Sequence, residues 1–137
     1  MSKILYREGY KYQLASSYSI NVDIYPTRDI DTEFLSLELG STTLSIRKGY
    51  AWDGPSWPAI DTKNFMRGSL VHDALYQLIR EGLLSIEHRG TADSILRRIC
   101  KEDGMSTIRA WWVFWGVRLG GGPAASADGE RSILEAP

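Results

Sequence analysis

The sequence predicts an α+β domain, with a small antiparallel sheet of three or four strands followed by three helices packed as a helical subdomain. Apolar residues alternate with polar ones in about the first fifty residues, and they recur at helical spacing further on. The length of 137 residues is usual for a single domain with one hydrophobic core. We therefore expect one domain over residues 1–122, with a β-rich part at 1–48, a structured loop at 49–60, a helical part at 61–122 and a flexible tail at 123–137.

The alternation predicts the strands of the N-terminal part. It is clearest in Ser17–Ile24, and it returns in Phe34–Leu39 and Thr42–Arg47, which a tight Gly40-Ser41 connection joins. Lys11–Leu14 is expected to form an edge strand.

Three helices are expected in the C-terminal part. Asn64–Glu81 carries apolar residues at helical spacing and stops at Gly82, which suits a helix C-terminus. Thr91–Glu102 is expected to form the second helix, which stops at Gly104, and Ser106–Leu119 the third.

The stretch KGYAWDGPSWPAI at Lys48–Ile60 joins the two parts. Its two prolines, two glycines and two tryptophans exclude a regular element and favour a structured loop. Within it, Gly54 allows unusual backbone angles and Pro55 stiffens the turn, so the loop can present carbonyls or the Asp53 side chain. An ordinary Asp-Gly turn at Asp53 would need no function.

His72 and Asp73 form the first candidate pair for chemistry. Adjacent residues on a helix point about 100° apart, so the imidazole and the carboxylate can serve different neighbours. Tyr76 lies one turn after His72 on the same face. A histidine suits a general base near neutral pH, and a carboxylate beside a loop of carbonyls suits calcium. The alternative is a core histidine with its hydrogen bonds satisfied, beside an aspartate that faces solvent.

Asp93 is the second candidate. It lies in the expected first turn of its helix, where an aspartate is favoured by the helix dipole and the free backbone N–H groups. The functional alternative is that Asp93 accepts a hydrogen bond from His72 and so orients the imidazole. Arg89, one turn earlier, would be placed to neutralise Asp93 instead.

The third expected helix is rich in tryptophan and apolar nearly all round, which favours a centrally packed helix. Contact with a membrane surface or a partner is the alternative. The residues along one side of this helix are Ile108, Trp111, Trp112, Trp115 and Leu119.

The composition argues against several classes of protein. The formal net charge of −1 gives no overall field that would attract nucleic acid or an anionic membrane, and the basic footprint of nucleic-acid binders is missing. Cys100 is the only cysteine, which excludes an internal disulfide and fits a reducing compartment. No signal peptide or transmembrane segment is evident, so we expect a cytoplasmic protein.

The motifs WDGPSWP, HDALY and RGTAD follow one another between Gly49 and Asp93. Their order resembles domain of unknown function family 1353, which occurs in phages and prophages, and the resemblance covers Lys48 to about Gly120. It implies a phage or prophage origin, and location in the bacterial host cytoplasm or in the virion. It implies no activity.

The HDALY motif is also similar to the His-Asp-x-x-Tyr helix of secreted and parvoviral phospholipases A2. This second resemblance implies that His72 is the general base, Asp73 a calcium ligand, Tyr76 a supporting residue and Asp93 the residue that orients the histidine. Gly54-Pro55 would stand at the calcium loop. Three departures weaken the likeness: a second glycine is missing after Gly54-Pro55, the disulfides of the secreted enzymes cannot form, and an N-terminal sheet is added.

Two functions are therefore expected alternatives. The first is a calcium-dependent hydrolase of phospholipid esters, with His72, Asp93 and Tyr76 in the catalytic site and Asp73, Asp53 and Gly54 around the ion. The second is a non-catalytic phage virion, tail or lysis accessory protein, which binds other phage structural proteins and uses the histidine and aspartates as a structural network.

Overall fold

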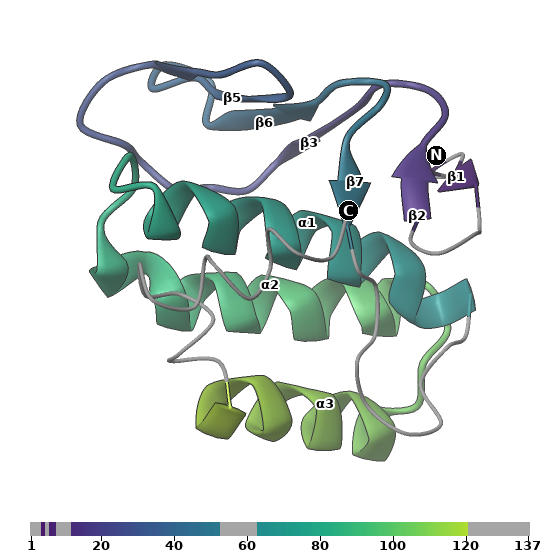
Figure 1. Cartoon of the computed structure of the whole chain (residues 1–137). Coiled ribbons are helices and arrows are strands. Elements are labelled where there is room, and N and C mark those ends of the chain that lie inside the picture. Colours follow the sequence, from purple (N-terminus) through teal and green to yellow (C-terminus); the bar gives the residue numbers. More distant parts are fainter. Residues whose placement is uncertain (1–3, 5, 8–11, 53–62, 121–137) are drawn as a thin grey trace. The chain divides into compact units, whose positions relative to one another are not determined.

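The computed structural model describes residues 4, 6–7, 12–52 and 63–120 of the chain, which divides into two compact units. The unit up to Asp53 contains the strands, and the unit from Gly54 contains the helices (Figure 1). The α+β class is thereby confirmed. The single domain over 1–122 stays a prediction, and the expected tail at 123–137 lies outside the described residues, as does the loop from residue 53 on.

One sheet of the first unit has three short antiparallel strands in the order β1-β2-β7. They are β1 (Tyr6–Arg7), β2 (Tyr12–Leu14) and β7 (Ala51–Trp52). The prediction that β2 is an edge strand is wrong, because β7 pairs with its second side. Strand β7 lies within the stretch 48–60, so the prediction that no regular element forms there is wrong for Ala51–Trp52. Its two residues are too few to show an alternation.

The other sheet has four antiparallel strands in the order β3-β6-β5-β4. They are β3 (Tyr18–Asn21), β6 (Thr43–Ile46), β5 (Leu35–Leu37) and β4 (Ile30–Asp31). The three longer strands lie inside the ranges that the alternation predicts, whereas β4 and a second sheet were not predicted.

The register of this sheet separates apolar from polar side chains. Leu37 pairs with Leu44 and Leu35 with Ile46, and all four side chains are buried. The hydroxyls of Ser19 and Ser45 lie 3.0 Å apart, because these residues are register partners across β3 and β6. A slip of one residue would expose the leucines, so burial fixes the pairing.

The chain passes from the second sheet to the first through Gly49. Its φ of 98° lies in the left-handed region, and a Cβ there would stand 3.1 Å from the Phe34 ring. Its N–H donates to the Leu14 carbonyl at 2.8 Å, and the Leu14 N–H donates to Tyr50 at 2.8 Å. Glycine is therefore required where this connection turns back onto β2.

The second unit consists of three α-helices and one short 3₁₀ turn. Helices α1 (Lys63–Arg80), α2 (Arg89–Glu102) and α3 (Thr107–Gly120) confirm the three predicted helices to within two residues at each end. The 3₁₀ turn η1 (Ile86–His88) precedes α2. Helix α2 lies between α1 and α3 (Figure 1).

Gly82 and Gly104 end α1 and α2, as the sequence predicts. Their φ values are 77° and 101°. After α1, the Leu83 N–H donates to the Leu78 carbonyl at 3.0 Å, and after α2 the Met105 N–H donates to Cys100 at 2.9 Å. These are the closing bonds of Schellman motifs, in which glycine adopts the left-handed conformation at no steric cost.

Helices α1 and α2 approach each other closely at Gly68. A Cβ there would stand 2.9 Å from Leu96 Cδ1 and 3.0 Å from Cys100 Sγ. Beside this contact, the buried Arg67 binds Asp103 through two bonds of 3.0 Å and Glu102 through one of 2.7 Å. The start of α1 is therefore fixed to the end of α2 by packing and by three charged hydrogen bonds from Arg67.

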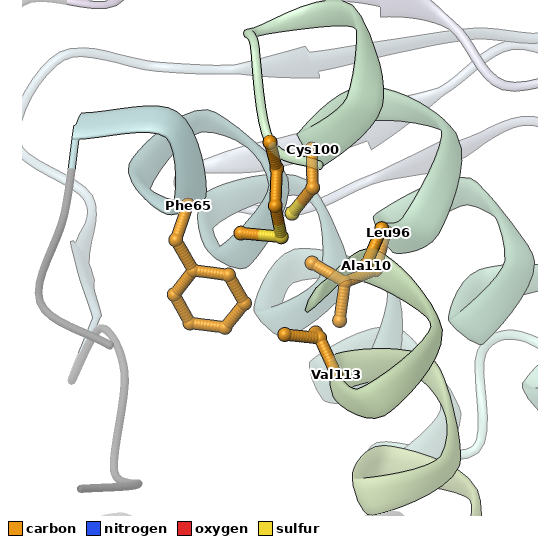
Figure 2. Close-up of a cluster of buried hydrophobic side chains, with 6 residues drawn as sticks. Phe65, Leu96, Cys100, Ala110 and Val113 are labelled. Atoms are coloured by element: carbon orange, nitrogen blue, oxygen red, sulfur yellow. The ribbon is translucent and has the colours of Figure 1, made fainter. Parts of the chain in front are cut away.

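Helix α3 packs on the other two helices through only one of its sides. Ala110 and Val113 of α3 enter a buried cluster with residues of α1 and α2 (Figure 2). Val117, also of α3, packs against this cluster. The prediction of a central helix packed on all sides is wrong, because its tryptophans are exposed. The other members of the buried cluster are Phe65, Leu96, Cys100 and Met105.

Candidate functional site

Helix α1 places His72 and Tyr76 one turn apart on the same face. Their ring centroids are 4.1 Å apart, with the ring planes inclined by 35°. Both residues are buried, with relative exposures of 7% and 3%. The helical spacing in HDALY therefore places an imidazole and a phenol side by side, as predicted from i and i+4.

Asp93 of α2 lies at the centre of the polar network, with none of its surface exposed. Its Oδ1 accepts hydrogen bonds from His72 Nε2 at 2.7 Å and from the Tyr76 hydroxyl at 2.6 Å. Its Oδ2 accepts from Arg118 Nη1 at 2.9 Å. One carboxylate thus joins all three helices, and we call these four residues the Asp93 network.

The network keeps Asp93 ionised. Burial alone raises the pKa of a carboxyl group, but the hydrogen bonds from His72, Tyr76 and Arg118 outweigh burial, and the pKa of Asp93 is lowered. The helix-dipole explanation does not account for this residue, because α2 begins at Arg89 and Asp93 lies beyond its first turn. Asp93 instead takes the orienting position that the functional alternative predicted.

The bond to Asp93 defines which nitrogen of His72 is available for proton transfer. In the neutral imidazole, Nε2 carries the hydrogen that is donated to Asp93, so the lone pair is on Nδ1. Nδ1 lies 3.8 Å from Oδ1 of Asp73. Burial lowers the pKa of His72, but the hydrogen bonds and charges of Asp73 and Asp93 outweigh burial and raise it.

Tyr76 acts as a donor in the network. Burial and the neighbouring Asp93 raise the pKa of its phenol, against a smaller lowering by Arg89. Arg89 Nε donates to the Tyr76 oxygen at 3.2 Å. Arg89 therefore supports Tyr76 and does not neutralise Asp93, which corrects the expectation from its position one turn earlier.

Arg118 is the member of the network that sequence reasoning missed. It neutralises Asp93 from the last turn of α3, and Arg89 Nη2 donates to its carbonyl at 2.6 Å. The signal available in the sequence was that Arg118, with Arg109, is one of two charged residues in a mostly apolar helix. It could not be used, because the periodicity of α3 does not say which neighbour its last turn meets.

The predicted calcium ligands are only partly described. Of the three predicted ligands, only Asp73 lies among the described residues, and 35% of its side chain is exposed. Asp53 and Gly54 lie outside the described residues. Within residues 63–120 and the other described segments, no group of three or more histidine, cysteine or acidic residues is placed to hold a metal ion. The geometry therefore supplies one oxygen donor that fits a hard cation.

The fold and site define the class of this protein: an α+β protein with a buried His-Asp-Tyr-Arg network that joins its three helices. The chain belongs to the family described as "Protein of unknown function (DUF1353)", whose sequence profile matches residues 29–117. The matched region includes His72, Tyr76 and Asp93 and ends one residue before Arg118. The comparisons with curated proteins and with solved structures found no match.

The network makes a prediction for the titration of His72. Its imidazole is expected to lose its proton above the ordinary pKa of 6.5, because two carboxylates stabilise the charged form. In an Asp93→Asn chain one of them is neutral while burial remains, so the midpoint should fall. NMR titration of the His72 ring carbon resonance measures both values, and equal midpoints would contradict the described bond.

The same shifts set the pH range in which the pair stabilises the fold. The contribution of His72 to the stability of the fold is present in full below pH 6.5, its ordinary pKa. It is lost as the pH rises through the raised pKa that His72 has in the folded chain. The contribution of Asp93 to stability is present in full above pH 3.8, its ordinary pKa. It is lost as the pH falls through the lowered pKa that Asp93 has in the folded chain. The pair is therefore most stabilising between about pH 4 and 6.5.

Proposed function

We propose that this protein is an ester hydrolase of the phospholipase A2 type, in which His72 is the general base. The observation that carries the proposal is the bond of 2.7 Å between His72 Nε2 and the buried Asp93, with Asp73 on the side of Nδ1. This is a base-and-orienter arrangement, in which one nitrogen is held by a carboxylate and the other can take a proton.

In the proposed reaction, His72 Nδ1 removes a proton from water as the water oxygen bonds to the ester carbonyl carbon. Asp93 stabilises the resulting imidazolium through Nε2, and Tyr76 holds Asp93 in place. The tetrahedral intermediate then breaks its bond to the alkoxy oxygen, which receives the proton from His72. The products are a carboxylic acid, which ionises, and an alcohol.

The oxyanion of the intermediate requires a positive charge or hydrogen-bond donors. Asp73 would hold a calcium ion for this purpose, with Asp53 and Gly54 as the further proposed ligands. When bound, such an ion would supply electrostatic stabilisation of the oxyanion. The exposed part of the Asp73 side chain supports this assignment.

Hydrolysis of vesicles of mixed phospholipids, with and without a calcium chelator, tests the proposal. The decisive variant is His72→Gln, because the amide nitrogen of glutamine can replace Nε2 as a donor to Asp93 but cannot act as a base. We expect the variant to lose at least about a hundredfold in rate while its thermal unfolding remains cooperative. His88→Asn is the matched control, since His88 is the only other histidine and lies in the connection before α2.

Two results would refute the proposal. The first is a wild-type chain that releases no fatty acid from any phospholipid at any calcium concentration. The second is release that persists unchanged in the His72→Gln chain, which would assign the activity to other residues or to a contaminant.

A non-catalytic role is the second candidate, and the full burial of Asp93 among three donors favours it. In that case the Asp93 network holds three helices together, and we propose a phage virion, tail or lysis accessory protein. Co-purification with tail or capsid proteins from phage-infected cells, together with absence of hydrolysis, would support this role.

A further inference from the structure

Helix α3 exposes an apolar face that its packing leaves uncovered. The exposed fractions are 45% for Trp111, 66% for Trp112 and 43% for Trp115, and Ile108 and Leu119 are exposed even more, at 73% and 82%. We call these five residues the α3 face. Side chains of this size are seldom exposed together on one helix unless the surface binds something.

The indole rings of the α3 face are arranged as one group. Trp111 contacts Trp112 edge to face at 5.8 Å and Trp115 at 6.2 Å, measured between ring centroids. Tryptophan combines a large apolar body with an N–H donor, which is why it is enriched where hydrocarbon meets water. Three such rings side by side suit a lipid interface.

The charges beside the α3 face select the kind of lipid. Residues Thr107–Gly120 include no acidic residue and two arginines, Arg109 and Arg118, of which Arg118 is paired with Asp93 at 2.9 Å. On the adjacent α2, the guanidinium of Arg97 lies 5.7 Å from the ring centroid of Phe114, so basic groups of α2 stand next to α3. Arg98 and Lys101 follow on the same helix, whose two acids are Asp93, which is buried, and Glu102, which pairs with Arg98 at 3.6 Å. An apolar stripe with a basic border is complementary to an anionic lipid surface.

We propose that α3 docks on an anionic lipid surface, lying in the plane of the interface with the α3 face turned toward the acyl chains. Its fourteen residues span about 21 Å, less than the roughly 30 Å of a hydrocarbon core. None of the described helices is long and apolar enough to cross a membrane. The helix therefore lies on the lipid rather than through it.

This docking is independent of hydrolysis, and it would bring the protein to a phospholipid substrate if the proposed function holds. It is measured as binding, by sedimentation of the full chain with vesicles of phosphatidylglycerol and phosphatidylcholine and by the blue shift of tryptophan fluorescence. The wild-type chain should sediment with these vesicles, less with pure phosphatidylcholine, and less at high salt. The His72→Gln chain should bind like the wild type, so failure of catalysis and failure of docking are distinguishable.

The double variant Trp112→Ser/Trp115→Ser tests the α3 face directly. Because each ring would be withdrawn from water on docking, we expect the pair of substitutions to weaken binding by at least about tenfold. The matched control is Leu83→Ser/Ile86→Ser, which removes two exposed apolar side chains before α2 and should leave binding unchanged. Circular dichroism of each variant verifies the helical content.

A second, electrostatic variant keeps the test independent of tryptophan. Lys101→Glu reverses an exposed charge on α2, the helix whose Arg97 lies over Phe114 of α3, and should reduce binding to the anionic vesicles while leaving the fluorescence of the free chain unchanged. The proposal is overturned if the wild-type chain does not sediment with vesicles, or if both variants bind as it does. Self-association of the wild-type chain that the tryptophan variant abolishes, without vesicle binding, would assign the face to a second copy and overturn the proposal as well.

Discussion

Replacing Asp93 with alanine is expected to lower the free energy of unfolding by about 3–5 kcal/mol. The substitution removes the acceptor for His72, Tyr76 and Arg118 at once, and it leaves two buried donors without a partner. The cost is large against the roughly 5–15 kcal/mol that stabilises a typical domain. Urea unfolding at pH 6, followed by circular dichroism, measures it.

Asp31→Ala provides the control for this experiment. Asp31 also pairs with an arginine, Arg47, at 2.7 Å, but 74% of its side chain is exposed. Solvent screens such a pair, so the change should stay within about 1 kcal/mol. If the two substitutions lowered the free energy of unfolding equally, burial would not strengthen the contacts of Asp93, and the Asp93 network would not be important for the stability of the fold.

The second large effect is expected from Asp93→Asn, a change that preserves the shape of the side chain. If the asparagine amide turns its NH₂ group toward His72, Nε2 must accept a hydrogen bond and the proton moves to Nδ1, where it blocks the base. If it turns the other way, its NH₂ group faces the guanidinium of Arg118, and the imidazolium loses the charge that stabilises it. Either orientation should reduce the rate of ester hydrolysis by roughly a thousandfold.

The measurement is the rate of fatty-acid release by the folded variant, compared with the wild-type chain at the same concentration on vesicles. Tyr76→Phe is the graded comparison, because it removes one donor to Asp93 and leaves the bond to His72 in place. We expect it to lose about tenfold or less. If the Asp93→Asn chain released fatty acid at nearly the wild-type rate, the Asp93 network would not take part in hydrolysis.

The hydrogen bond between His72 and Asp93 was one of the two alternatives that the sequence offered for Asp93, and local spacing could not choose between them. The HDALY motif places His72 and Tyr76 on one helical face without any tertiary information. The position of Asp93 opposite them depends on the crossing of α1 and α2, for which Gly68 leaves the necessary room. The sequence therefore offered this contact only as the functional alternative for Asp93, which the resemblance to phospholipases A2 also implies.

Two features were mispredicted because they depend on what lies beside a segment. The sequence predicts β2 as an edge strand, because the two residues of β7 give no pattern of their own. It predicts α3 as a packed helix, because an apolar sequence is the same whether a helix is covered by protein or exposed to solvent. Its Arg118 was overlooked for the same reason.

By itself, the sequence determined the periodic elements of this protein: the long strands, the three helices, and the ends of two of them at Gly82 and Gly104. These follow from side-chain spacing and backbone freedom, which act over a few residues. Only the tertiary structure decided that Asp93 is buried among three donors and that α3 keeps its tryptophans exposed. Both depend on contacts between helices, and the energies of burial and of hydrogen bonding are defined only once the neighbours are in place.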